Sequence, residues 1–187
     1  MRHVFMGNQH CDLHCFTLWS DIIDSFKINV NIGFVILDDT KECSADILVM
    51  LKNEKTKRVE LCSPNWIPHL PSHIRRLFIY GGKWLNDNLL YDIILKVPNI
   101  STLEIENGSK LTNNAIQFLI TKCRYLEHFY INSCEKITDV TLLSLANASA
   151  HLKTVCLICN SVPFRYDAFK CLIAKQSSIL FAFCTVQ

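Results

Sequence analysis

The residues best suited to chemistry lie near the amino terminus, in the sequence His10-Cys11-Asp-Leu-His14-Cys15. Imidazole and thiolate groups are the usual ligands of zinc, and a spacing of four residues on a helix brings like residues together. No second ligand pair in the sequence has a matching spacing. We therefore expect no metal site here and treat these four residues as part of a terminal segment, with zinc binding as the remote alternative.

A second cysteine pair, Cys156 and Cys159, has the two-residue separation of redox motifs. The repeat described below accounts for both positions, one as a strand residue and the other beside a turn, so a redox role is not expected. The sequence contains no Gly-x-Ser-x-Gly, no phosphate-binding glycine loop and no His-Glu-x-x-His. We predict that the chain is not an enzyme and needs no cofactor.

The composition favours a folded protein. Half of the 187 residues are hydrophobic, and the formal net charge of +2 comes from 19 basic and 17 acidic residues spread along the chain, which disfavours nucleic acid as a partner. The longest apolar runs are too short to span a bilayer, so no membrane insertion is expected. Ten cysteines, with no signal-peptide apolar core in residues 1–10, predict reduced thiols and a cytoplasmic or nuclear location.

The elements that carry these residues follow an internal repeat of 26 residues, in which Leu103 corresponds to Phe129. Two passages, 100–105 and 126–131, share one apolar spacing, and each is followed by a polar turn and an apolar run at helical spacing. Each unit is therefore predicted to be a strand, a turn and a helix, and stacked units share one core. Repeating this 26-residue step in both directions along two strand positions predicts two rows, and every member is apolar: Leu77, Leu103, Phe129, Val155, Phe181, and Ile79, Ile105, Ile131, Leu157, Phe183.

The helical runs repeat with the same step. Their apolar positions lie at i, i+3 and i+4, on one helix face: Leu90/Ile116/Leu142/Ala168, Ile93/Leu119/Leu145/Cys171 and Ile94/Ile120/Ala146/Leu172. Three of these runs follow pairs of residues with short oxygen-bearing side chains, which are predicted to cap the helix starts: Asn86-Asp87, Thr112-Asn113 and Thr138-Asp139.

The amino-terminal part is less regular. Apolar residues at helical spacing between positions 16 and 26 predict one amphipathic helix, with a short strand at 4–6 as its partner, in a capping segment of residues 1–31. A strand at 34–37 and a helix after Ser44 follow. The next unit is shorter, because its strand residue Leu61 corresponds to Ile79 of the following unit, which is fewer than 26 residues away. The prolines of this unit predict extended or 3₁₀ backbone in place of the helix. We assign residues 32–187 to one repeat domain of about six units.

The stretch from Cys123 to Asp139 reads Cys-Arg-Tyr-Leu-Glu-His-Phe-Tyr-Ile-Asn-Ser-Cys-Glu-Lys-Ile-Thr-Asp. It resembles the cysteine-containing class of leucine-rich repeats, whose signature is roughly Cys-x-x-Leu-x-x-Leu-x-Leu-x-x-Cys-x-x-Ile-Thr-Asp. The resemblance is strong over residues 74–183 and weaker over 32–74. It implies an α/β fold, a leucine-rich-repeat solenoid in the form of a curved horseshoe fragment, with parallel strands on the concave face and helices on the convex face.

This repeat class is best known from F-box proteins, which are substrate receptors of cullin-RING ubiquitin ligases. The resemblance therefore implies a protein-protein interaction module, here a substrate-recognition adaptor of such a ligase that holds its target on the concave face. No F-box is visible near residues 13–26. The alternative is a scaffold or assembly factor of a larger complex, since small mitochondrial factors that assist assembly of respiratory-chain or ATP-synthase complexes contain similar repeats.

The outward residues of the strands are the candidate binding residues. Aromatic and arginine side chains on a solvent-facing sheet suit a protein-protein hot spot because rigid aromatics bury much area at little entropy cost. The alternative is that the aromatic residues are present only for β-propensity. In three rows with the same step, the predicted partner-binding residues are Arg76, Thr102 and His128, then Phe78, Glu104 and Tyr130, then Tyr80, Glu106 and Asn132.

The end of the sequence predicts a sixth strand around Phe181-Ala-Phe183, with no helix or polar cap after it. Such a strand would expose an apolar edge. Either a partner covers this edge, or the preceding helix at 166–173 tucks the strand in.

Overall fold

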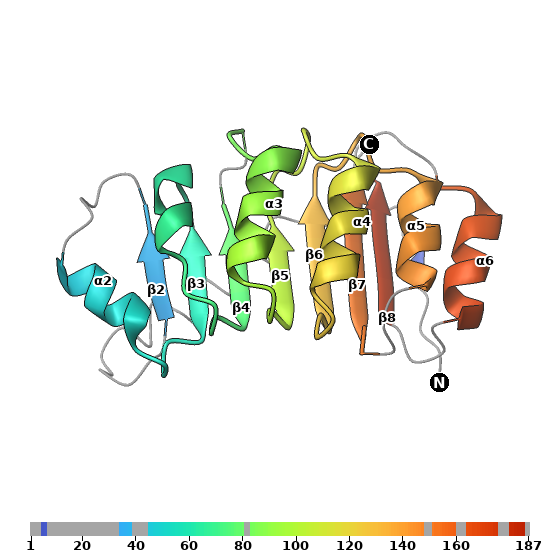
Figure 1. Ribbon diagram of the computed structural model, residues 1–187. Helices are drawn as coiled ribbons and strands as arrows, with labels where there is room; N and C mark the ends of the chain where they lie inside the picture. The colour runs from blue at the N-terminus through green and yellow to red at the C-terminus, as the bar shows by residue number, and fades with distance from the viewer. Residues whose placement is uncertain are drawn as a thin grey trace.

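The computed structural model describes residues 5–6, 34–38, 45–80, 83–147, 151–159, 164–175 and 180–185. Within these residues the chain forms one α/β unit, an all-parallel sheet of eight strands in the order β1-β8-β7-β6-β5-β4-β3-β2 (Figure 1). The strands are β1 (Phe5–Met6), β2 (Phe34–Leu37), β3 (Arg58–Leu61), β4 (Arg76–Ile79), β5 (Thr102–Ile105), β6 (His128–Asn132), β7 (Thr154–Cys159) and β8 (Leu180–Thr185).

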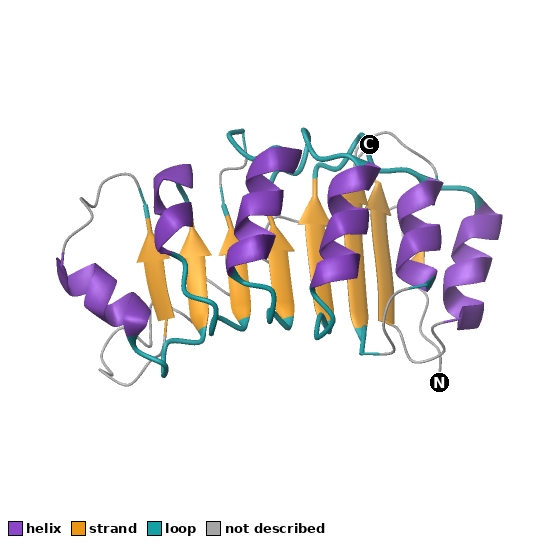
Figure 2. Cartoon of the chain, in the orientation of Figure 1, coloured by secondary structure: helices purple, strands orange, loops and turns teal. Residues whose placement is uncertain are grey.

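The helices form one layer on one face of this sheet (Figure 2). They are α2 (Ala45–Lys52), the 3₁₀ helix η1 (Pro64–His69), α3 (Asp87–Lys96), α4 (Asn113–Lys122), α5 (Asp139–Ala146) and α6 (Tyr166–Lys175). From α3 onward each helix packs on the next one in the chain. None of the described helices is long and apolar enough to cross a bilayer.

The strand register confirms the predicted step. Leu77 pairs with Leu103, Leu103 with Phe129 and Phe129 with Val155, and the second row of predicted positions is aligned in the same way, so both rows extend to β8. From β4 to β7 these side chains are at most 1% exposed. Because alternate residues of a strand point to opposite faces, the rows lie under the helices and the residues between them face the other way.

The helix positions predicted to be apolar do form the other half of the core. Ten of the twelve are buried, and the remaining two, Ile120 and Cys171, are partly buried and pack against the core. The irregular unit also has the expected form, because η1 replaces an α-helix after β3. It begins after Ser63, whose Oγ accepts a hydrogen bond from the backbone N–H of Asn65 at 3.3 Å.

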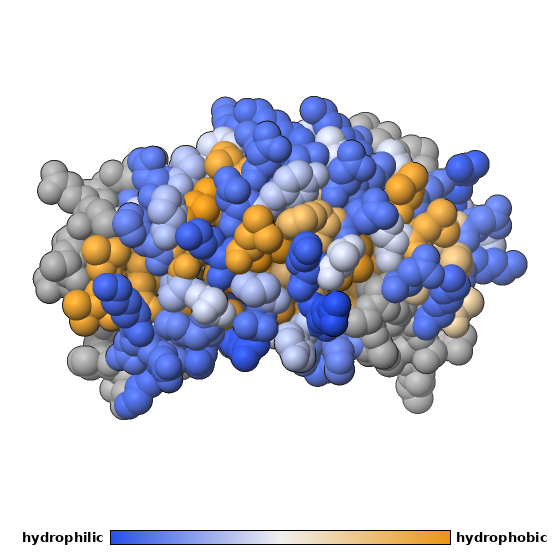
Figure 3. All heavy atoms as spheres, in the orientation of Figure 1, coloured by the Kyte–Doolittle hydropathy of each residue, from blue (hydrophilic) through white to orange (hydrophobic). Residues whose placement is uncertain are grey.

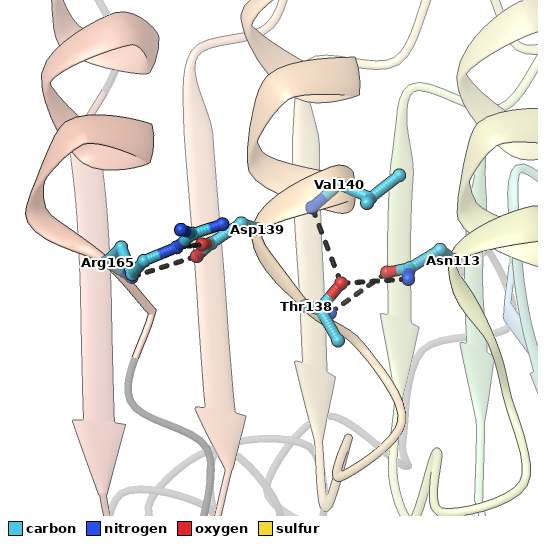
Figure 4. A network of polar contacts seen from close by, with 5 residues as sticks. All are labelled: Asn113, Thr138, Asp139, Val140 and Arg165. Atoms are coloured by element: carbon cyan, nitrogen blue, oxygen red, sulfur yellow. Dashed lines mark hydrogen bonds and ion pairs between the residues drawn. The ribbon is translucent and has the colours of Figure 1, made fainter.

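The two polar residues at each helix start have different hydrogen-bonding roles, which their residue types alone did not predict. The first residue of each pair caps its own helix: Asn86, Thr112 and Thr138 accept from the backbone N–H groups of Leu89, Asn114 and Val140. The second residue instead accepts a backbone N–H of the next unit. Asp87 accepts from Thr112 at 2.9 Å. Figure 4 shows the next two bonds, in which Asn113 accepts from Thr138 at 2.9 Å and Asp139 from Arg165 at 2.8 Å.

The two ends of the described chain meet at one edge of the sheet. β1 pairs in parallel with β8, with Phe5 opposite Ala182 and Met6 opposite Phe183. The prediction that the short strand at 4–6 is the partner of an amino-terminal helix stays a prediction, because that helix lies outside the described residues. The edge of β8 is paired with the chain's own first strand, an outcome that neither of the two predicted alternatives included. The predicted helix between positions 16 and 26 lies outside the described residues.

Candidate functional site

The predicted binding residues come together on the face of the sheet opposite the described helices. The register aligns Arg76 with Thr102 and His128, and it aligns Phe78 with Glu104 and Tyr130. The third row, Tyr80, Glu106 and Asn132, continues the same alignment, because the backbone N–H groups of Tyr80 and Glu106 donate to Leu61 and Ile79 of the preceding strands at 3.0 and 2.9 Å. All nine side chains therefore share one surface. Whether a partner binds there stays a prediction.

The middle of this surface alternates aromatic and acidic side chains. Glu104 lies between Phe78 and Tyr130 in the register, and Phe78, Tyr80, Glu104, Glu106 and Tyr130 line one small depression, which we call the acid–aromatic patch. Phe78 is 9% exposed, and the other four residues are partly buried. The patch therefore presents aromatic rings and carboxylates side by side to another molecule.

Two further residues of this surface were not among the predicted ones. Arg58 and Glu60 lie on β3, opposite Arg76 and Phe78. The Arg58 guanidinium donates to the Glu60 carboxylate at 2.8 Å, and it lies over the Phe78 ring at 4.2 Å from the ring centroid. The repeat did not identify them because the step from β3 to β4 is shorter than the others. The alternation of Arg58 and Glu60 with apolar Val59 and Leu61 was the signal that could have identified them.

Burial perturbs the acidic and phenolic groups of the surface. Burial is the largest effect on Glu60 and Glu104 and raises the pKa of both carboxyl groups, while nearby Arg58 opposes the rise. The pKa of Tyr80 is raised to about 12, first by burial and then by the negative charges of Glu60 and Glu104. The Tyr80 phenol therefore stays protonated at neutral pH, and its oxygen is available as a hydrogen-bond donor and acceptor.

The carboxylates of the patch are not matched by cations. In the part of the chain that the structure describes, lysine and arginine form ion pairs with Glu60, Glu127 and Asp139, and none with Glu104 or Glu106. Arg58 is therefore one positive charge among three carboxylates, Glu60, Glu104 and Glu106. Glu104 is partly buried, and the nearby Arg58 charge offsets its desolvation only in part, so an incoming cation would lower its energy further.

The edge of the surface near the strand starts has a different charge pattern. Arg76 is exposed, and so is His128 two strands further along the same row, whose side chain is 47% accessible. Next to His128, Glu127 accepts a hydrogen bond from Lys153 at 2.6 Å, and this bond is the first cause that lowers the pKa of Glu127. Basic side chains thus gather where the strands begin, and unpaired carboxylates where they end.

The opposite side of the molecule offers no comparable grouping among the described residues. Figure 3 shows the helix side, where apolar side chains appear in separate places between polar ones. The large exposed apolar residues come from different helices and turns: Val49, Met50, Leu95, Tyr125, Val140, Leu143 and Tyr166. Singly exposed apolar residues are normal on a protein surface. The sheet face is therefore the better candidate for binding.

The cysteines do not form a reactive site in the described residues. Cys62, Cys123, Cys156 and Cys171 are present as thiols, and burial raises the pKa of Cys123 to about 12. Cys134 is disulfide-bonded, so the prediction of reduced thiols is wrong at this position. No group of three potential metal ligands occurs among the described residues, and His10, Cys11, His14 and Cys15 lie outside them. No protein-family model matches the chain.

Proposed function

We propose that this chain is a leucine-rich-repeat solenoid that binds another protein on the face of its sheet opposite the described helices. Two features support the fold assignment. The same step is carried by four successive strand pairings, and the stretch from Cys123 to Asp139 follows the signature of the cysteine-containing repeats. In such an arrangement each unit contacts its neighbours, and the strands together present one extended binding surface.

The acid–aromatic patch is the observation that carries the binding proposal. If this sheet face had only a structural role, apolar side chains or ion-paired charges would stabilise it best. It contains instead Glu104 and Glu106, which form no ion pairs with lysine or arginine among the described residues. Burial raises the pKa of Glu104, which means that its charged form is disfavoured in the free protein. Groups held in an unfavourable state inside a depression are typical of functional sites.

We propose further that the chain acts by holding its partner and performs no bond chemistry. The first role is a substrate-recognition adaptor of a cullin-RING ubiquitin ligase, in the cytoplasm or nucleus, which the resemblance to F-box repeat proteins favours. The second role is a scaffold or assembly factor of a larger complex, including mitochondrial ones.

Affinity capture from cells with matched variants tests these proposals. The test variant replaces Tyr80 and Tyr130 of the patch by serine, and the control replaces Tyr125 and Tyr166, exposed tyrosines outside the sheet face. We expect partner proteins to be recovered with the wild type and the control and to be lost with the test variant. Recovery of cullin-ligase adaptor components supports the first role, and subunits of another stable complex support the second. An identical set of proteins with all three baits would contradict binding at the sheet face.

A further inference from the structure

The chemistry of the patch also restricts what the partner can present to it. We propose that the acid–aromatic patch binds a basic side chain, arginine or lysine, from an extended segment of the partner protein. This inference rests on the proposed function, because it names the chemistry of the partner at that same face.

Charge is the first argument. Three carboxylates, Glu60, Glu104 and Glu106, lie near one another, and Arg58 is bound to the first of them. Glu104 and Glu106 are two residues apart on one strand edge and therefore project from the same face. A partner cation placed between them would form charge-assisted hydrogen bonds, which are stronger than those between neutral groups. An acidic or apolar side chain would add no positive charge to that of Arg58, which is already paired with Glu60.

The rings of the patch are the second argument, because the protein already uses them for a cation of its own. Arg58 stacks on Phe78 at 4.2 Å from the ring centroid while donating to Glu60 at 2.8 Å. The combination of an aromatic face and a carboxylate on the neighbouring strand is repeated once further along the sheet, where Glu104 lies beside Tyr130. Aromatic faces attract arginine and lysine within about 6 Å. The second copy of this combination therefore offers a basic side chain the same two contacts that Arg58 receives.

The charge pattern along the strands is the third argument. Arg76 and His128 are exposed at the strand starts, whereas the unpaired carboxylates of Glu104 and Glu106 lie at and beyond the strand ends. A partner segment that lay in one direction across this face would meet basic groups first and acidic groups second. We therefore expect the bound segment to present its own basic residue to the strand ends, which also fixes its orientation.

A peptide selection tests the inference. Random dodecapeptides displayed on phage are selected on the purified domain, and enriched peptides are then measured by fluorescence anisotropy against three proteins. These are the wild type, the double variant Glu104→Gln/Glu106→Gln, and the control Glu54→Gln/Asp92→Asn. The control changes the net charge by the same amount at two exposed positions outside the sheet face. Circular dichroism and thermal melting establish that all three are folded.

We expect the enriched peptides to contain arginine or lysine in excess over the starting library. We also expect their affinity to fall at least about tenfold in the double variant, as for the loss of charge-assisted hydrogen bonds, and to be unchanged in the control. Replacing the basic residue of a peptide by glutamine should have the same effect as the double variant.

Two results would overturn the inference. Enriched peptides without basic residues, or with equal affinity for wild type and double variant, refute the basic partner, and if Tyr80→Ser/Tyr130→Ser still abolishes their binding, the proposed binding face stands. A selection that enriches no peptide also refutes the inference, and the capture experiment then decides on the proposed function alone.

Discussion

Replacing Asn113 by alanine tests how the repeated units are joined. The Asn113 side chain makes three hydrogen bonds to the next unit, and Figure 4 shows the two that join it to Thr138. Its Oδ1 accepts from the Thr138 backbone N–H at 2.9 Å and from the Thr141 hydroxyl at 2.8 Å, and its Nδ2 donates to the Thr138 hydroxyl at 2.9 Å. Thr141 is fully buried, so the substitution would leave its hydroxyl without this acceptor and without access to water.

The expected loss of stability follows from these contacts. Three hydrogen bonds at about 1 kcal/mol each give roughly 3 kcal/mol. Alanine returns about 0.5 kcal/mol through its higher helix propensity, which leaves a net loss of about 2–3 kcal/mol. Single domains are stable by only about 5–15 kcal/mol, so this is a large fraction. With a denaturant dependence of about 2 kcal/mol per molar urea, the unfolding midpoint should fall by about 1–1.5 M.

Two variants sharpen the Asn113→Ala measurement. Asn114→Ala alters the exposed neighbour, whose side chain makes no hydrogen bond among the described residues, and it should leave the midpoint nearly unchanged. Asn113→Asp keeps the accepting oxygen and introduces the residue found at the corresponding positions 87 and 139, so it should cost less than about 1 kcal/mol. If Asn113→Ala costs no more than Asn114→Ala, the hydrogen bonds do not join the units in the way described.

Three further predictions concern packing, charge and the sheet edge. Gly108→Ala should destabilise the fold by about 1–3 kcal/mol in urea unfolding, since a Cβ would lie 2.5 Å from Ile131 Cδ1. Glu104→Gln should raise the melting temperature at pH 7 and have little effect at pH 4. Burial raises the folded-state pKa of Glu104 from 4.5, so its charge reduces stability only once the pH exceeds the unfolded value; equal melting temperatures of wild type and variant at pH 7 would contradict this. Deleting residues 178–187 should lower the melting temperature, because it removes β8 and with it the pairing to both β7 and β1; unchanged melting would speak against that pairing.

The repeated part of the fold was predictable because one spacing governs many residues. Leu103 and Ile105 define the step, and the register follows it through β8. Prediction failed where the spacing between successive strands is shorter, as between β3 and β4, and where a strand pairs with a segment remote in the sequence, as β1 does with β8. Arg58 and Glu60 were missed in the shorter unit, although they complete the candidate site.

The helix starts show a second limit of the sequence. Residue types at Thr112-Asn113 predicted capping, but type alone cannot distinguish an acceptor for the same helix from an acceptor for a group in the following unit. The disulfide at Cys134 was missed for a related reason. Its cysteine fits the repeat signature, and that signature concerns packing and says nothing about oxidation state.

The pairing of β1 with β8 also has a consequence for the order in which the protein folds. Most strand pairings join neighbouring units, so they can form as soon as each unit leaves the ribosome. β1 is made first, yet its partner is made last, with Phe5 opposite Ala182. At synthesis rates of about 5–20 residues per second, β1 waits roughly 10–40 s before β8 exists. We therefore expect β1 to dock last, after the pairings between neighbouring units have formed.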